Sequence, residues 1–200
     1  MPILLFLWSL LLPATAVPGL PTPPCDTQTE ASDDGFPAGQ VYRCESGKVL
    51  LKSDAALEII EAKSHKLRGA VDFSTNSFAW TVEVRSFEGF NNQLQREHFN
   101  ENYMESDKFP KASFAGKIIE QIDWATDGTY SVRAKGKLKV HGVEQERIIK
   151  SQIVVAGKKI HINSSFTVPL SDHNITIPRI VYQKIAEEIT VTIDADLKPE

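Results

Sequence analysis

The sequence predicts an all-β fold in which a single antiparallel sheet closes into a barrel. Between Gly128 and Leu197, apolar and polar residues alternate over long stretches, and shorter stretches of the same kind precede them. Successive side chains of a strand point to opposite faces, so each stretch predicts one dry and one wet face. Because amphipathic strands are many and helical patterns few, we expect a sheet that closes around an apolar interior.

The segment that precedes the strands predicts an exported protein. The first twelve residues carry no charge and are too short for a stable membrane span, and Ala14-Thr15-Ala16 forms a small-x-small cleavage pattern. We interpret residues 1–16 as a signal peptide cleaved near Ala16, with a buried strand or a short anchor as the alternative. This predicts a periplasmic or secreted protein.

Residues 17–40 predict an extended arm, because five prolines stand there among small and polar residues. The arm holds Cys25, and the expected first strand holds Cys44. An even number of cysteines in an exported protein is more often a disulfide than a reactive site. We therefore expect a Cys25–Cys44 bond that ties the arm to the first strand, followed by one domain over residues 41–200.

The expected elements of residues 41–127 follow in order. Strands are expected over residues 41–51, 59–67, 69–73, 78–85 and 112–118, with a capped turn over 53–58. The residues Leu94, His98, Phe99, Asn102 and Tyr103 recur at helical spacing. They predict a short amphipathic helix over 91–105 that crosses one end of the sheet.

Alternation is clearest in the C-terminal strands. Their expected inward residues are Tyr130, Val132, Ala134, Gly136, Leu138 and Val140, then Ile160, Ile162, Ser164, Phe166, Val168 and Leu170, then Ile189, Val191, Ile193, Ala195 and Leu197. His141-Gly142 predicts a hairpin turn, because glycine adopts a positive φ without strain. Asp172-His173-Asn174 predicts a solvated turn. Pro178 favours a second short helix over 178–186, since a helix start needs no N–H from its first residue.

Charge and motifs exclude several functions. A net charge of −4 gives no broad attraction to nucleic acid. The histidines and cysteines have neither H-x-x-x-H nor C-x-x-C spacing, so we expect no metal site. The sequence has no G-x-S-x-G and no phosphate-cradling glycine loop. We therefore expect no catalytic residues, no enzyme activity and no cofactor.

Two stretches resemble a known family. Leu94–Asn100 followed by Asp107–Phe114, together with Gly136–Val143, resemble the YceI-like polyisoprenoid-binding family. The resemblance covers about residues 41–199, and the tail from Pro178 to Pro199 is similar to the branch common in Bacteroidetes. It implies a lipocalin-like antiparallel barrel of about eight strands, to which the residue patterns above add two short helices. It also implies a periplasmic carrier or scavenger that holds a long-chain isoprenoid lipid or isoprenoid quinone. We expect such a protein to contact a membrane transiently for loading.

For the interior, the residues by themselves favour a packed core over the alternative, a container. Aromatic rings can fill a barrel of this size, whereas the small inward residues Ala134, Gly136, Ser164 and Ala195 leave room for a ligand. The resemblance favours the container. The candidate ligand-binding residues are Phe78, Trp80, Val82, His98, Phe99, Phe114, Ile118, Tyr130, Ala134, Leu138, Ile162, Phe166 and Val191.

His98 is the candidate contact for the ligand head group. It can donate a hydrogen bond to a quinone oxygen, or instead make a structural hydrogen bond that closes its end of the barrel. An enzyme that uses His98 as acid or base is a rival hypothesis, and it requires a second titratable group beside His98. A solid-cored interaction module without a small-molecule ligand is the other alternative.

Overall fold

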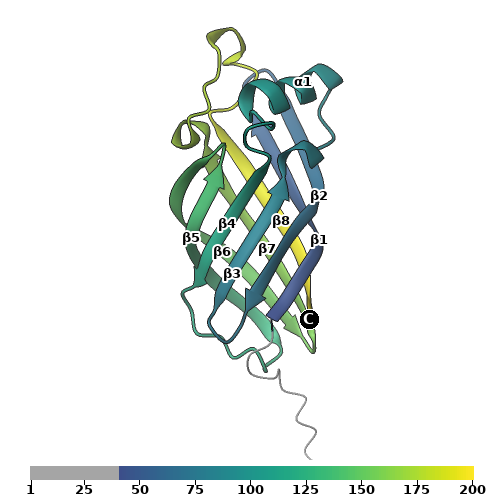
Figure 1. Cartoon of the computed structure of the whole chain (residues 1–200), viewed down its shortest axis with the longest axis vertical. Helices are drawn as coiled ribbons and strands as arrows, with labels where there is room; N and C mark the ends of the chain where they lie inside the picture. Colours follow the sequence, from purple (N-terminus) through teal and green to yellow (C-terminus); the bar gives the residue numbers. More distant parts are fainter. Residues whose placement is uncertain (1–40) are drawn as a thin grey trace, which may run out of the picture. The chain divides into compact units, whose positions relative to one another are not determined.

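The computed structural model describes residues 41–200, which form a closed barrel of eight antiparallel strands (Figure 1). Each strand pairs with the next along the chain, and the last pairs with the first. The strands are β1 (Val41–Asp54), β2 (Ile59–Asp72), β3 (Ser77–Glu83), β4 (Lys111–Ile118), β5 (Gly128–Val140), β6 (Val143–Ala156), β7 (Lys159–Pro169) and β8 (Glu188–Pro199). The predicted fold class is confirmed.

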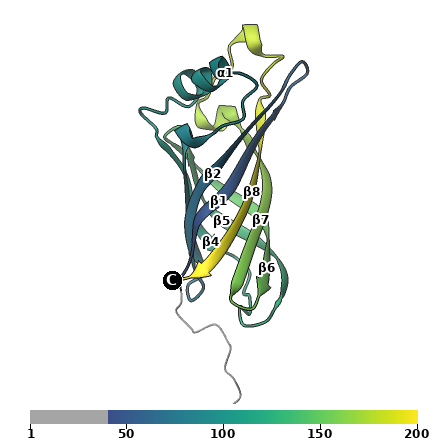
Figure 2. The same ribbon diagram turned by 90° about the vertical axis from the view of Figure 1, so that its right-hand side faces the viewer.

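Because neighbouring strands run antiparallel, the connections between them lie alternately at the two ends of the barrel (Figure 2). One end, which we call the helical end, carries residues 55–58, 84–110, 141–142 and 170–187. The opposite end, the turn end, carries residues 73–76, 119–127 and 157–158. The predicted hairpin at His141-Gly142 is confirmed, because both residues have positive φ and Val140 pairs with Val143.

The helix predicted over 91–105 is confirmed at the helical end. It consists of α1 (Gln93–His98), which continues into a π-helical turn, η2 (Phe99–Tyr103). The side chain of Asn92 caps α1 by accepting the N–H of Gln95 at 2.9 Å. Within residues 41–200, no helix has both the length and the apolar character needed to span a bilayer.

The second helix predicted over 178–186 is wrong, because only a 3-10 turn, η4 (Arg179–Val181), forms there. Backbone groups after this turn find partners in the barrel instead of in a helix. The carbonyl of Gln183 accepts the N–H of Leu57 at 2.9 Å, and the N–H of Ala186 donates to Ser53 Oγ at 2.9 Å. These tertiary hydrogen bonds compete with helix propagation.

The two strands predicted over 59–67 and 69–73 are one strand, β2. Gly69, which we expected to start a new strand, continues the ladder and pairs with both Cys44 and Trp80. A Cβ atom at this position would overlap the ring of Trp80. The glycine is therefore needed for close approach of that ring and not for a turn.

Three aromatic rings close the turn end of the barrel. The rings of Tyr42 and Phe73 have centroids 4.8 Å apart, and those of Phe73 and Trp124 are 4.1 Å apart. Trp124 is buried although it lies in a loop, and its Nε1 donates to Asn76 Oδ1 at 3.3 Å. This plug separates the barrel interior from solvent at the turn end.

Cys44 points into the barrel near the same end. Its Sγ donates to the carbonyl of Leu67 at 3.9 Å, and burial raises the pKa of its thiol. Within residues 41–200, Cys44 has no disulfide partner. Cys25, the arm and the predicted signal peptide lie outside the described residues, so the disulfide stays a prediction.

Candidate functional site

An apolar cavity of about 540 Å³ fills the half of the barrel next to the helical end. Inward side chains of the strands form its wall, among them Leu51, Val82, Leu138 and Val191. Residues 84–110, which include α1, and the segment 170–187 complete its upper part. This volume lies within the range typical of small-molecule sites, which are also predominantly apolar.

Four side chains form the floor of this cavity, since they also line a second space of about 50 Å³ below it. They are Trp80, Phe114, Phe166 and Ile193. Beneath the small cavity the interior is packed down to the aromatic plug. The interior is therefore hollow near the helical end and filled near the turn end. The container considered in the sequence analysis describes the first half of the barrel, and the packed core describes the second.

The cavity opens at the helical end, because Leu94, His98 and Lys184 both line it and are exposed to solvent. Polar groups gather at this mouth. Glu58 accepts hydrogen bonds from Asn91 Nδ2 at 3.0 Å and from Gln95 Nε2 at 2.6 Å. These bonds lower the pKa of Glu58 and join α1 to the β1–β2 turn.

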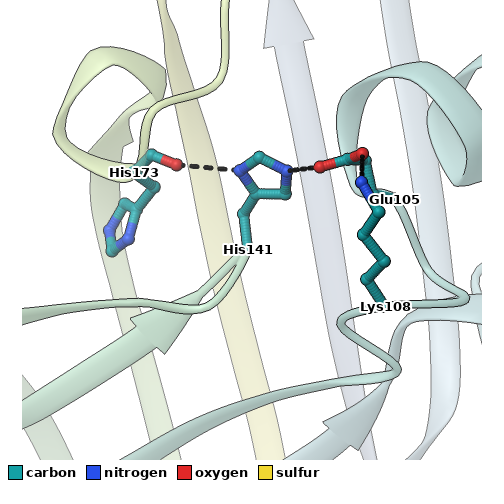
Figure 3. A network of polar contacts seen from close by, with 4 residues as sticks. All are labelled: Glu105, Lys108, His141 and His173. Atoms are coloured by element: carbon teal, nitrogen blue, oxygen red, sulfur yellow. Dashed lines mark hydrogen bonds and ion pairs between the residues drawn. The ribbon is translucent and has the colours of Figure 1, made fainter.

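A polar network fixes the segment that follows η2 (Figure 3). The ring of His141 lies between two acceptors, with Nδ1 3.0 Å from the carbonyl oxygen of His173 and Nε2 3.0 Å from Glu105 Oε2. Lys108 Nζ donates to Glu105 Oε1 at 2.6 Å, and this bond, followed by that of His141, lowers the pKa of Glu105. The network ties the β5–β6 hairpin to two connections at the helical end.

His173 is fully buried beneath this network. The turn predicted over 172–174 forms and Asn174 is exposed, but the expectation that His173 is solvated is wrong. His173 Nδ1 donates to the carbonyl of Val143 at 3.2 Å, and burial lowers the pKa of its imidazole. Asn174 takes the left-handed conformation that ends the 3-10 turn η3 (Leu170–His173). Polar sequence alone did not indicate that the histidine faces inward.

The structure brings twelve of the thirteen candidate ligand-binding residues to the two cavities. Eight line the large cavity: Trp80, Val82, His98, Phe99, Phe114, Leu138, Phe166 and Val191. Four line only the small one: Phe78, Ile118, Ala134 and Ile162. The thirteenth, Tyr130, lines neither, and its hydroxyl donates to the carbonyl of Thr126 at 2.7 Å at the turn end.

Sequence reasoning missed most of the mouth. Phe87, Phe90, Gln95, Val181, Lys184 and Ile185 all line the large cavity. Except for Gln95 they belong to connections, where no periodic pattern shows which side chain faces inward. The inward residues of β1 and β2, such as Val49 and Ala62, also line it and could have been found from their alternation.

His98 stands at the mouth without a structural hydrogen bond of its ring to any residue in the range 41–200. Glu58 and Lys184 line the same cavity, but no hydrogen bond or ion pair in the described chain joins either of them to His98.

A closed eight-stranded antiparallel barrel with an apolar cavity open at one end places the chain in the lipocalin-like fold class. The family model of the YceI-like domain matches residues 52–197, and the chain therefore belongs to the YceI-like family. No curated protein matches the sequence.

Solved structures show the same fold. A polyisoprenoid binding domain from Saccharophagus degradans, implicated in plant cell wall breakdown, superposes with a TM-score of 0.66 at 9% identity, covering 82% of this chain and 99% of that one. BcnA from Burkholderia cenocepacia gives 0.63 at 17% identity, with 75% and 95% covered. The YceI protein of Campylobacter jejuni gives 0.51 at 19%, with 65% and 77% covered.

Proposed function

We propose that this protein is an exported carrier or scavenger that holds the tail of a long-chain polyisoprenoid or isoprenoid quinone in the large cavity. The observation that carries the proposal is the cavity itself: about 540 Å³, apolar along its walls, closed below and open at one end. A solid-cored interaction module does not fit a space of this size. The polyisoprenoid binding domain from Saccharophagus degradans, which shares the fold, supports this ligand class.

The shape of the cavity divides the ligand between two environments. Burial of the tail is favourable by about 0.8 kcal/mol for each methylene removed from water. The walls offer no ordered row of polar groups, so they select for an oily chain rather than for a particular sequence of polar atoms. The head group would remain at the mouth, where Gln95, His98 and Lys184 stand beside the exit.

The chemistry of the mouth fits binding without reaction. Neutral or anionic head groups can accept hydrogen bonds from His98 or Lys184. The ligand is thus held non-covalently, and no covalent step by a residue of the chain is needed for a carrier or scavenger. The N-terminal signal peptide expected from the sequence supports export to the periplasm or beyond.

Mass spectrometry of lipid extracted from the purified protein tests this function. We expect an isoprenoid lipid or quinone in nearly stoichiometric amount with the wild-type chain. The matched pair of variants is Ala112→Trp, which fills the cavity from β4, and Ala115→Trp, which faces solvent on the same strand. Ala112→Trp should lose most of the lipid and Ala115→Trp should retain it. Equal lipid content in both variants, or none in wild type, would overturn the proposal.

A further inference from the structure

Exposed apolar side chains gather around the mouth of the cavity. Of the eight large hydrophobic residues that are exposed within residues 41–200, five lie at the helical end: Leu57, Ile59, Leu94, Ile180 and Tyr182. We call these five residues the apolar rim. Ile180 is 91% exposed, which is unusual because an isoleucine side chain stabilises a fold mainly when it is buried.

The most exposed part of the rim projects from the barrel. In both views the segment 178–187 extends beyond the ends of the strands at the helical end (Figures 1 and 2). Its base is fixed, because the carbonyl of Gln183 accepts the N–H of Leu57 and the N–H of Ala186 donates to Ser53 Oγ. These two hydrogen bonds therefore hold the segment that carries the exposed side chains of Ile180 and Tyr182.

The charge of this tip complements an anionic lipid surface. Arg179 and Lys184 flank the apolar residues, both are exposed, and no acidic residue stands between Pro178 and Lys184. Tyrosine is enriched at the level of lipid head groups, and cationic side chains beside apolar ones are attracted to anionic lipids.

The rim is continuous with the lining of the cavity. Leu94 belongs to both, and Val181 and Lys184, which line the cavity, are neighbours of rim residues in the tip. A lipid that leaves a bilayer under this rim can enter the cavity without exposing its tail to water. This continuity favours a membrane as the partner over a second protein.

We propose that the apolar rim docks on an anionic lipid bilayer, with Ile180 and Tyr182 inserted among the head groups and Arg179 and Lys184 against the lipid phosphates. The inference rests on the proposed function, because a docked mouth is useful to a protein that exchanges lipid. The two can nevertheless fail separately, since docking needs no isoprenoid in the vesicle and ligand uptake needs no vesicle.

Flotation with vesicles of phosphatidylethanolamine and phosphatidylglycerol, free of isoprenoids, tests the docking. Wild type should float with these vesicles. The double variant Ile180→Ser/Tyr182→Ser should lose on the order of tenfold in partitioning, because it removes apolar area from the inserted tip. The matched control is Ile148→Ser on the outer wall of β6, where the side chain is 58% exposed but distant from the rim. It should float like wild type.

A second pair of measurements separates electrostatic attraction and ligand binding. Arg179→Gln/Lys184→Gln should reduce flotation with anionic vesicles and leave the weaker flotation with phosphatidylcholine vesicles unchanged. Quenching of the tryptophan fluorescence, to which Trp80 in the cavity floor contributes, by a short-tailed isoprenoid quinone should be the same for wild type and Ile180→Ser/Tyr182→Ser. The docking proposal is overturned if wild type does not float with anionic vesicles, or if Ile180→Ser/Tyr182→Ser and Ile148→Ser float equally well. Loss of quenching in wild type would instead overturn the proposed ligand.

Discussion

Gly116 and Gly136 face each other across the β4–β5 pair with no space for a side chain on either. A Cβ atom on Gly116 would overlap the carbonyl oxygen of Lys135, and one on Gly136 would overlap that of Ala115. We expected Gly136 to widen the interior, but the structure shows that it allows two backbones to approach closely. Ala134 and Ser164, by contrast, do line the small cavity.

This pair predicts a strong effect of a single methyl group. Gly136→Ala should lower the free energy of unfolding by about 2 kcal/mol or more, because backbone atoms cannot move aside as side chains can. Gly128→Ala is the control on the same strand, since the nearest atoms to its Cβ lie 3.6 Å away. Urea denaturation measures both variants. Equal stability of the two would show that the β4–β5 pair relaxes without cost.

The floor of the cavity should limit the length of the bound tail. Phe166→Ala removes a ring that separates the large space from the small one. We expect the extracted lipids to shift toward longer tails, together with a loss of about 3 kcal/mol of stability. Mass spectrometry of wild-type and variant protein from the same culture conditions gives the distribution of tail lengths. An unchanged distribution would mean that the floor does not define the ligand.

His98 should recognise an oxygen of the head group. His98→Ala should weaken binding of an isoprenoid quinone about fivefold, which corresponds to one hydrogen bond of about 1 kcal/mol. The same variant should bind an isoprenoid hydrocarbon without oxygen as tightly as wild type does. Fluorescence titration measures both ligands, with His65→Ala on the outer face of β2 as control. Equal quinone affinity for wild type and His98→Ala would remove His98 from the site.

Burial of His173 makes stability depend on pH. Its folded pKa lies below the ordinary value of 6.5, so the unfolded chain binds this proton more readily. The stabilising contribution is therefore complete above about pH 6.5 and is lost as pH falls toward the lowered folded value. His173→Asn should flatten the decline in unfolding free energy between pH 7.5 and 5.5, whatever its stability at pH 7.5. A slope identical to that of wild type would contradict this assignment.

The barrel could be predicted because alternation is a local signal. Inward residues of β5, β7 and β8 follow the period of two that burial on one face imposes, and the register of the sheet preserves it. The helix over 91–105 was found for the same reason, since its apolar spacing and the cap at Asn92 are encoded nearby. These features need no knowledge of distant residues.

The sequence by itself determined the closed antiparallel sheet and most of the side chains that line its interior. Only the tertiary structure decided that the interior is hollow above Trp80 and Phe166 and filled below them, because packing depends on volumes contributed by all eight strands at once. The tertiary structure also determines the conformation of the cavity mouth. Residues 178–186 form hydrogen bonds to Leu57 and Ser53, more than a hundred residues away, instead of a continuous helix. Contacts of that range leave no periodic trace in the chain.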